Sequence, residues 1–339
     1  MASIKDVAKL AGVSIATVSR YMADPDSIRE KNRQGVAQAI ATTGYAPNTL
    51  AQNFRRGKTS LVLVILPDIG DPFFTDIMEG ISRVAKELKY SILIRETGMN
   101  TLSWDDYSAM ILSKQADGII LLASICPFTP AADRPEGAQQ VPIVLSCENV
   151  TPELGQFPSV RIDNVRAARD ATNHLLALGH ENIAFISGLA TSTLTADREE
   201  GYRQAIRQAN PKNPAGRVVE GGLCLDGARR ATRELLSDKH PPTAIFCSND
   251  EMAMGSIHEI KAANLRVPED ISVIGFDGIR YAEIMDPPLT TIVQPAREIG
   301  EKTMRRLARS IAGENIGSGV EIVPHELKVR SSTCPPPAT

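Results

Sequence analysis

Residues 4–22 read IKDVAKLAGVSIATVSRYM, and the glycine inside this stretch separates two short helical patterns. The first begins at Ser3, and Asp6 follows at the spacing of an acidic capping box. Gly12 ends this helix, and Ser14 caps a second one of about eight residues. Apolar side chains recur on one face of each helix, at Ile4, Val7, Ala8 and Ala11 and then at Val18 and Met22. Two short helices joined by a glycine-containing turn predict a helix-turn-helix unit.

A third helical pattern follows this unit. It begins at Ser27, has Glu30 at the spacing of a capping box, and ends at Gly44. Its apolar face carries Val36, Ala39 and Ile40. Periodicity alone fits any small helical bundle, so a purely structural bundle stays open as an alternative.

In a helix-turn-helix unit the N-terminal half of the second helix faces the DNA bases, while the first helix crosses the phosphate backbone. Hydroxyl groups can donate to phosphate oxygens, and an arginine can reach a guanine edge or a phosphate. Apolar side chains can contact a thymine methyl group but cannot form bidentate hydrogen bonds. The predicted DNA contacts of this unit are Ser14, Ile15, Ala16, Thr17, Ser19 and Arg20.

The charge of the chain is unevenly distributed. Up to Lys58 the sequence has nine Lys and Arg residues against four acidic ones, a net charge of +5, whereas the remainder carries −8. A basic segment attached to an acidic body is typical of a small nucleic-acid-binding module joined to another domain. Taken alone, an ordinary solvated helical face explains the charge equally well.

From Leu61 onward, short apolar runs alternate with amphipathic helical patterns. The runs that predict buried strands are residues 61–68, 90–96, 117–124, 142–146, 158–163, 182–188, 217–222, 243–248 and 271–277. Helices are predicted at 73–89, 101–114, 165–178, 196–209, 226–238 and 250–263. This alternation indicates βαβ units, and therefore an α/β fold with doubly wound parallel sheets behind an all-α head.

The strands form two series on either side of about residue 161, which predicts two similar lobes. The last stretch, with a strand at 289–295, a helix at 296–312 and strands near 320–330, is expected to return to the first lobe and finish in the second. The predicted domains are a head at 1–46, a hinge and linker at 47–59, and a core at 60–334, with lobe one at about 60–161 and 292–322 and lobe two at about 162–291 and 323–334. Ligands bind beyond the carboxyl ends of such strands, so the cleft between the lobes is the expected binding site.

Two strings in the N-terminal region, D-V-A-x-x-A-G-V-S-x-x-T-V-S-R at 6–20 and TTGYAPNTLAQNF at 42–54, resemble the DNA-binding head of the LacI/GalR family of bacterial repressors. The resemblance implies that Ile15, Ala16 and Arg20 occupy the base-reading positions. It also implies that the whole chain is a DNA-binding transcriptional regulator.

The same resemblance implies a hinge helix from Asn48 to about Arg55. In the family this helix lies in the minor groove at the operator centre and inserts an apolar side chain, usually Leu, between base pairs. Its predicted DNA contacts here are Asn48, Leu50, Ala51 and Phe54. Phe54 takes the inserting position, which is a departure from the family. So short a helix is marginal alone, and we expect it to order only on DNA.

The body resembles the LacI/GalR core, which has a periplasmic-binding-protein-like fold. The supporting strings are D-x-x-D-P-F-F-T-D-I-M-E-G-I (68–81), I-D-N (162–164), L-G-H-E-N-I-A-F-I-S-G (178–188), S-N-D-E-M-A-M-G (248–255), V-P-E-D-I-S-V-I-G-F-D (267–277) and K-V-R-S-S-T (328–333). LPDIGDPFF (66–74), GIILLAS (118–124) and DPPLTTIVQP (286–295) are most similar to the cytidine-responsive branch of the family.

By position, the resemblance implies a small effector held in the inter-lobe cleft. Its predicted contacts are Phe73 and Phe74 on the first lobe, Arg198, Asn249 and Asp277 on the second, and Gln294 near the crossover. Aromatic faces can stack on a sugar or base ring, and charged groups can orient hydroxyls. Core packing is the alternative role for the two phenylalanines.

One departure from the family concerns the effector. Purine-binding relatives have a second Arg and a Thr on the loop after Gly188, where this chain has Ser192 and Leu194. This argues against a purine base. A nucleoside, a sugar and a sugar phosphate stay open, as does the sign of the effector's action.

No P-loop, strand-linked GxGxxG, HExxH or GxSxG motif occurs, and the histidines and cysteines lack metal-ligand spacing. We therefore expect no enzyme activity, no cofactor and no metal. No apolar run is long enough for a transmembrane helix, the N-terminus lacks a signal-peptide pattern, and the five scattered cysteines fit reduced thiols. These features predict a bacterial cytoplasmic protein that joins the nucleoid when bound to DNA, and they argue against the alternative of a solute-binding protein for transport.

The expected protein is a homodimer whose two heads bind a pseudo-palindromic operator in double-stranded DNA. Binding of the effector in the cleft is expected to control the DNA affinity, and the regulated genes are expected to serve catabolism or carbon metabolism.

Overall fold

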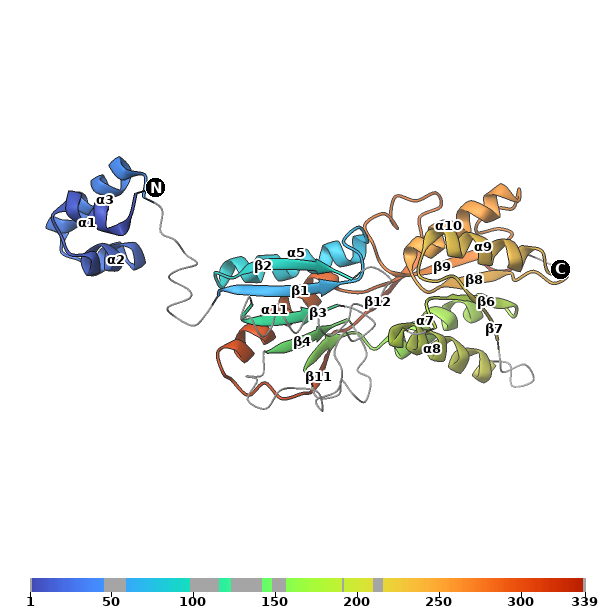
Figure 1. Ribbon diagram of the computed structural model, residues 1–339. Helices are drawn as coiled ribbons and strands as arrows, with labels where there is room; N and C mark the ends of the chain where they lie inside the picture. Colours follow the sequence, from blue (N-terminus) through green and yellow to red (C-terminus); the bar gives the residue numbers. More distant parts are fainter. Residues whose placement is uncertain are drawn as a thin grey trace. The chain divides into compact units, whose positions relative to one another are not determined.

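The computed structural model describes residues 2–45, 59–97, 116–122, 142–147, 157–190, 192–209 and 216–337. The chain divides into two compact units, Met1–Thr59 and Ser60–Thr339 (Figure 1). Each unit contains its own cluster of buried apolar side chains. The predicted fold class, an all-α head and an α/β core with largely parallel sheets, is confirmed.

The first unit contains the predicted helix-turn-helix, formed by α1 (Ile4–Ala11) and α2 (Ile15–Ala23). Ser3 and Asp6 form the capping box, since the Ser3 backbone N–H donates to Asp6 Oδ2 at 2.8 Å and the Asp6 N–H donates to Ser3 Oγ at 3.4 Å. Gly12 ends α1 with a left-handed φ of 65°, which glycine adopts at little cost. Ser14 Oγ accepts the Thr17 N–H at 3.1 Å and so caps α2, as predicted.

The third helix, α3 (Glu30–Thr43), starts later than predicted. Ser27 does not cap it, because Ser27 lies in a 3₁₀ turn, Pro25–Ser27, and its hydroxyl donates to the Asp24 carbonyl. Arg29 is the residue before α3, and its side chain makes no cap hydrogen bond. The capping-box spacing was therefore misleading, because a proline-initiated 3₁₀ turn uses the same serine.

The head has a compact apolar centre. Its fully buried side chains are Val7, Val18 and Val36, and Ala8, Ile28 and Ala39 are nearly so. Ile4, Ala11, Met22 and Ile40 pack against them and are partly exposed. The apolar faces predicted for the helices are thus the faces that meet.

The first sheet of the core contains β1 (Leu61–Leu66), β2 (Ser91–Glu96), β3 (Gly118–Leu121), β4 (Ile143–Ser146), β5 (Ser159–Arg161) and β11 (Val320–Ile322). Its strand order is β11-β5-β4-β3-β1-β2, and every pairing is parallel. The predicted helix at 101–114 lies outside the described residues.

The prediction that β2 is buried is wrong. Leu93 and Ile94 are 39% and 40% exposed. Within the described residues β2 is the last strand of its sheet and pairs only with β1, so it has a neighbour on one side only. Its apolar composition indicated a strand correctly but could not show that the strand is at the sheet edge.

The second sheet contains β6 (Ile183–Ser187), β7 (Arg217–Glu220), β8 (Ala244–Cys247), β9 (Ser272–Asp277), β10 (Thr290–Val293) and β12 (Glu326–Lys328), in the order β12-β10-β9-β8-β6-β7. Only the β10–β12 pairing is antiparallel among the pairings described. The helices α7 (Asn164–Ala177) and α8 (Thr193–Ala209) pack together, as do α9 (Leu225–Leu236) and α10 (Asp250–Ala262), and the two pairs cover opposite faces of this sheet (Figure 1). The arrangement is doubly wound.

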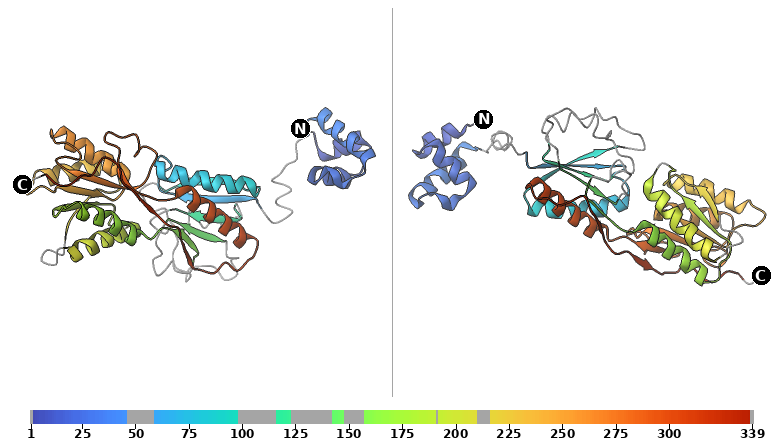
Figure 2. Two further views of the ribbon diagram at one scale, coloured as in Figure 1. Left: turned by 180° about the vertical axis from the view of Figure 1, so that it is seen from behind. Right: turned by 90° about the horizontal axis from the view of Figure 1, so that it is seen from below.

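The chain passes between the two sheets after β5, after β10 and after β11. The strand β10 pairs with β9 in the second sheet, whereas the following helix α11 (Ala296–Ile311) packs on α5 (Pro72–Glu87) against the first sheet (Figure 2). The strand β11 then pairs with β5, and β12 returns to β10. The domain limits drawn from the sequence stay a proposal.

The helices α5 and α11 approach each other closely at two glycines. A Cβ at Gly80 would overlap the carbonyl of Arg297, and one at Gly300 would overlap the carbonyl of Ile77. Ion pairs flank this crossing, from Arg297 to Glu79 at 2.9 Å and from Arg305 to Glu87 at 2.8 Å. The crossover segment before α11 is therefore anchored firmly in the first lobe.

Candidate functional site

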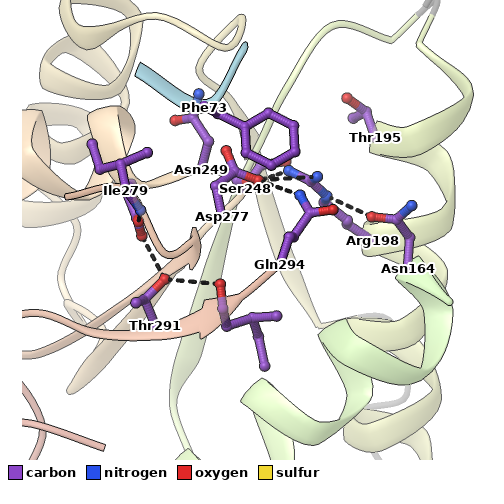
Figure 3. Close-up of polar contacts among 12 residues, drawn as sticks. Phe73, Asn164, Thr195, Arg198, Ser248, Asn249, Asp277, Ile279, Thr291 and Gln294 are labelled. Atoms are coloured by element: carbon purple, nitrogen blue, oxygen red, sulfur yellow. Dashed lines mark hydrogen bonds and ion pairs between the residues drawn. The ribbon is translucent and has the colours of Figure 1, made fainter. Parts of the chain in front are cut away.

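Arg198 is a buried cation near the carboxyl ends of the second sheet, and it is only 4% exposed. Its Nη2 lies 3.2 Å from Asp277 Oδ1, and its Nε donates to Asn164 Oδ1 at 3.0 Å (Figure 3). Its Nη1 donates to the Ser248 carbonyl, and its guanidinium carbon lies 3.8 Å from the centre of the Phe276 ring. Residues of α7, of β9 and of the loop after β8 thus hold one side chain, which is shielded from bulk water.

Asp277 is the last residue of β9 and the acidic partner of Arg198. Its φ of 104° is rare for a residue with a side chain and places it at the end of the strand in a strained conformation. Gln294, just beyond β10, donates its side-chain amide to Asp277 Oδ1 at 2.7 Å. Burial raises the pKa of Asp277 to about 7, although the charge of Arg198 lowers it.

A cavity of about 300 Å³ adjoins this pair. Phe73 and Asp76 of α5 line it from the first lobe, Asp277 and the next two residues line it from the second, and residues 293–298 of the crossover complete it. This volume is at the lower end for small-molecule sites. The structure therefore brings Phe73, Asp277 and Gln294 together around one space.

The remaining predicted effector contacts have clear packing roles as well. The ring of Phe74 is half-buried, packs against the main apolar cluster, and lies 5.6 Å from the ring of Phe73. Asn249 is buried beside Asp277 (Figure 3), and its side-chain oxygen caps α10 by accepting the Met252 N–H at 2.8 Å. All six predicted effector contacts stay proposals.

Asp250 is a buried acid next to the site that the sequence reading missed. Its Oδ1 accepts the Thr291 hydroxyl at 2.6 Å, and its Oδ2 accepts the Ile279 N–H at 2.8 Å. It thus joins the start of α10, the loop after Asp277, and β10. Burial, and then the negative charge of Asp277, raise the pKa of Asp250 to about 8. It stands next to Asn249 in the string S-N-D, which was the only signal for it in the sequence.

Replacing Asp250 by asparagine is expected to weaken the pH dependence of stability. The pKa of Asp250 is about 8 in the folded state against 3.8 ordinarily, so the folded chain keeps a proton that the unfolded chain releases. Its stabilising contribution is complete below about pH 4 and declines as the pH rises toward 8. Urea unfolding at pH 5 and pH 8 measures this effect. The free energy of unfolding should fall less between these pH values in Asp250→Asn than in the wild type.

Asp270→Asn is the matched control for this experiment. Hydrogen bonds from Arg266 lower the pKa of the half-buried Asp270 to about 2, so its contribution is present at both pH values and is lost only in stronger acid. In Asp270→Asn the free energy of unfolding should therefore fall between pH 5 and pH 8 by as much as in the wild type. If the free energy of unfolding of Asp250→Asn also falls by the wild-type amount between pH 5 and pH 8, Asp250 is ionised throughout this range.

Further acids lie around the cleft on both lobes. Asp71 caps α5 by accepting the Phe73 N–H at 2.8 Å. Burial raises the pKa of Asp71, the charge of Asp68 raises it further, and Arg198 lowers it. Burial likewise raises the pKa of Glu251 at the start of α10, and the charges of Asp71 and Asp68 add to this. Carboxylates of the two lobes are thus close enough to repel one another.

The predicted DNA contacts of the head lie on the outer side of α2. Ser14, Ile15, Ala16, Ser19 and Arg20 are exposed, whereas Thr17 is half-buried and its hydroxyl lies 2.9 Å from that of Ser14. Val18 is buried on the opposite side of the helix. One face of α2 therefore packs and the other is free for a partner. The predicted hinge contacts Asn48, Leu50, Ala51 and Phe54 lie outside the described residues, and all ten DNA contacts stay proposals.

Among the described residues, no three His, Cys, Asp or Glu side chains are grouped so that they could hold a metal ion. None of the helices described is both long and apolar enough to cross a membrane.

Comparison with known proteins decides the family. The HTH-type transcriptional repressor CytR of Escherichia coli strain K12 is 38% identical to this chain over 332 residues, which are 98% of this chain and 96% of the relative. The chain belongs to the LacI family. The family described as bacterial regulatory proteins, lacI family, matches residues 3–48, and a periplasmic binding protein-like domain matches residues 172–333. The predicted family is thus confirmed, and a head of this kind sets aside the solute-binding alternative.

Solved structures agree with this assignment to the LacI family. The lac repressor dimer bound to operator and the anti-inducer ONPF superimposes with a TM-score of 0.84 at 27% identity, covering 98% of this chain and 99% of that one. The transcriptional regulator CelR–cellobiose complex superimposes with a TM-score of 0.71 at 28% identity, covering 98% and 100%. This LacI-family chain is a DNA-binding transcriptional regulator, and its relatives are regulators rather than enzymes.

Proposed function

We propose that this LacI-family protein is a repressor whose affinity for its operator is set by a small effector bound between the two lobes of the core. The observation that carries the proposal is the buried arrangement of Arg198, Asp277 and Gln294 beside a cavity that Phe73 lines from the other lobe. A ligand that touches both lobes stabilises one arrangement of them over others. The exposed face of α2 supplies the DNA-binding surface of the same chain.

We place the repressor on DNA as a homodimer at a pseudo-palindromic operator. The reading positions of one head offer two apolar side chains and one arginine, which specify few base pairs. Two heads with a fixed spacing double this information. A relative that is 27% identical has been solved as a dimer bound to its operator, which supports the arrangement. A regulator of this kind acts where the bacterial chromosome is, in the cytoplasm.

The hinge is proposed to complete the DNA contact. Asn48, Leu50, Ala51 and Phe54 would lie along the minor groove, with Phe54 between base pairs at the operator centre. Opening a base step costs a few kcal/mol and is offset by the contacts that bent DNA permits. Effector binding would act by changing the spacing of the two hinges.

The charges around the cleft favour an uncharged effector over a sugar phosphate. The cations Arg198 and Arg297 are already paired with carboxylates, at 3.2 Å to Asp277 and 2.9 Å to Glu79. Asp68, Asp71 and Glu251 add further negative charge around the cleft. A phosphate monoester carries a charge of about −1.5 to −2 at pH 7 and would be repelled there. A nucleoside or a sugar can instead offer hydroxyls to Asp277 and a ring face to Phe73.

A thermal-shift experiment on the full chain tests this proposal, with cytidine, cellobiose and ribose 5-phosphate as probes. A ligand at 100 times its dissociation constant stabilises the folded state by about 2.7 kcal/mol. We expect an uncharged probe to raise the melting temperature and ribose 5-phosphate to leave it unchanged. The stabilising probe must also change operator affinity, by about 5- to 150-fold in typical cases.

Two results would count against the proposal. Stabilisation by ribose 5-phosphate alone would contradict the uncharged effector. A probe that stabilises the core without altering operator affinity would contradict the coupling between cleft and DNA, because such coupling is reciprocal.

A further inference from the structure

Thr195 lies in the first turn of α8, three residues before Arg198. Residues three apart lie on the same side of a helix, and Figure 3 shows both side chains leaving α8 on one side. Both are buried, since Thr195 is 2% exposed and Arg198 is 4% exposed. Thr195 therefore lies one helical turn from Arg198, the cation that pairs with Asp277, although it was not among the predicted effector contacts.

The hydroxyl of Thr195 has no hydrogen-bond partner within the part of the chain that the structure describes. Buried threonines elsewhere in the core do have partners. Thr172 Oγ1 donates to the Ala168 carbonyl at 2.8 Å, and Thr232 Oγ1 donates to the Ala228 carbonyl at 2.8 Å and to Ser256 Oγ at 3.0 Å. A buried polar group without a partner costs stability, so most such groups are satisfied or serve a function.

The surroundings of this hydroxyl place it at the ligand-binding end of the second sheet. A Cβ at Gly188, the residue directly after β6, would overlap Thr195 Oγ1 and the side chain of Leu223. The Thr195 hydroxyl thus lies over the carboxyl end of β6. In doubly wound sheets, ligands bind beyond the carboxyl ends of the strands.

We propose that the Thr195 hydroxyl is a further effector-binding group of the cleft, which hydrogen-bonds to a polar atom of an uncharged, hydroxyl-bearing effector. The inference rests on the proposed function, because it assigns a residue to the same effector site. Among the described residues of the free chain this hydroxyl has no partner, and the bound effector supplies one. Thr195 would then contribute to specificity, since an effector without a hydrogen-bonding atom there would leave the hydroxyl unpaired.

Replacing Thr195 by valine tests this, because valine has the same shape and lacks the hydroxyl. In the free protein Thr195→Val should raise the melting temperature by about 2 °C, since it removes an unsatisfied buried group. The same variant should bind the effector more weakly, by about tenfold. Titration calorimetry with cytidine and cellobiose, on the full chain, measures the affinity.

Two matched variants serve as controls. Thr195→Ser keeps the hydroxyl and should keep the wild-type affinity. Thr232→Val removes a buried threonine hydroxyl that has two partners, so it should lower the melting temperature and leave the affinity unchanged. A higher melting temperature combined with weaker binding is not expected for a residue with a purely structural role.

The outcomes separate this inference from the proposed function. If the wild type binds a probe and Thr195→Val binds it equally well, the inference is wrong and the proposed function stands. A lower melting temperature of free Thr195→Val would also overturn it, because the hydroxyl would then have a partner in the free protein. If the wild type binds neither uncharged probe and responds only to ribose 5-phosphate, the proposed effector class fails and the inference fails with it.

Discussion

Replacing Arg198 by methionine is expected to destabilise the core by about 3–5 kcal/mol and to abolish the response to effector. Methionine has a similar length but supplies no charge and no donors. Asp277, Asn164 and the Ser248 carbonyl would each lose a hydrogen-bonding partner at a buried position. Urea unfolding gives the change in stability, and thermal shift with cytidine and cellobiose gives the loss of binding.

The loss of stability should also depend on pH. Without the cation, the pKa of Asp277 rises above its value of about 7, and the folded chain then holds a proton that the unfolded chain releases. A carboxyl with a raised folded-state pKa becomes more destabilising as the pH rises toward that pKa. The Arg198→Met variant should therefore lose more stability at pH 8 than at pH 5.

The double variant Arg198→Met with Asp277→Asn is the control. It removes the unpaired carboxylate, so it should recover much of the stability while effector binding stays lost. The head folds as a separate unit, and DNA binding without effector should persist in both variants. An Arg198→Met variant as stable as the wild type would contradict the expectation that the ion pair between Arg198 and Asp277 stabilises the core.

Replacing Arg20 by alanine is expected to weaken operator binding by about 10- to 100-fold while leaving the fold of the head unchanged. One arginine–guanine contact contributes about 1–3 kcal/mol of discrimination. Arg20 is exposed on α2, so its side chain can be removed without opening the core around Val18. Fluorescence anisotropy on an operator selected from random DNA, and on unrelated DNA, measures the affinity and the preference.

The salt dependence distinguishes the two possible contacts of Arg20. The relevant slope is that of the logarithm of the binding constant against the logarithm of the salt concentration. If Arg20 contacts a base, its replacement lowers the preference for the operator and changes this slope little. If it contacts a phosphate, affinity falls on all sequences and the slope decreases by about one. Arg33→Ala is the control, because Arg33 lies on α3 and is paired with Asp26 at 3.0 Å and Glu30 at 3.2 Å. Equal loss of operator binding, effector binding and stability in Arg20→Ala would mean that Arg20 is structural.

Local signals in the sequence predicted most secondary structure of the described residues. The capping box at Ser3, the left-handed Gly12 and the cap at Ser14 are each decided within four residues, and the structure has all three. The error at Ser27 has the same origin, because the sequence offers two local hydrogen-bonding patterns there. The proline-initiated 3₁₀ turn, Pro25–Ser27, is the one that forms.

Only some of the cleft residues could be predicted from the sequence. The family resemblance pointed to Arg198, Asp277 and Gln294, and the structure joins these three by an ion pair and a hydrogen bond. Asn164, Ser248 and Asp250 were not predicted as site residues, although each lies within one of the family strings I-D-N and S-N-D-E-M-A-M-G. Each makes its contact with a residue at least 29 positions away in the chain, and no spacing rule covers such a pair.

The sequence by itself determined the elements and their order, because capping, periodicity and strand composition act over a few neighbouring residues. It determined the family too, since dense motifs cover the chain from the head to its last strand. Only the tertiary structure decided which strand is at the sheet edge and which carboxylates share a cleft. It alone showed that the Thr195 hydroxyl is buried and has no hydrogen-bond partner among the described residues. Burial, pKa shifts and unsatisfied hydrogen bonds depend on distances between segments far apart in the chain, which packing sets.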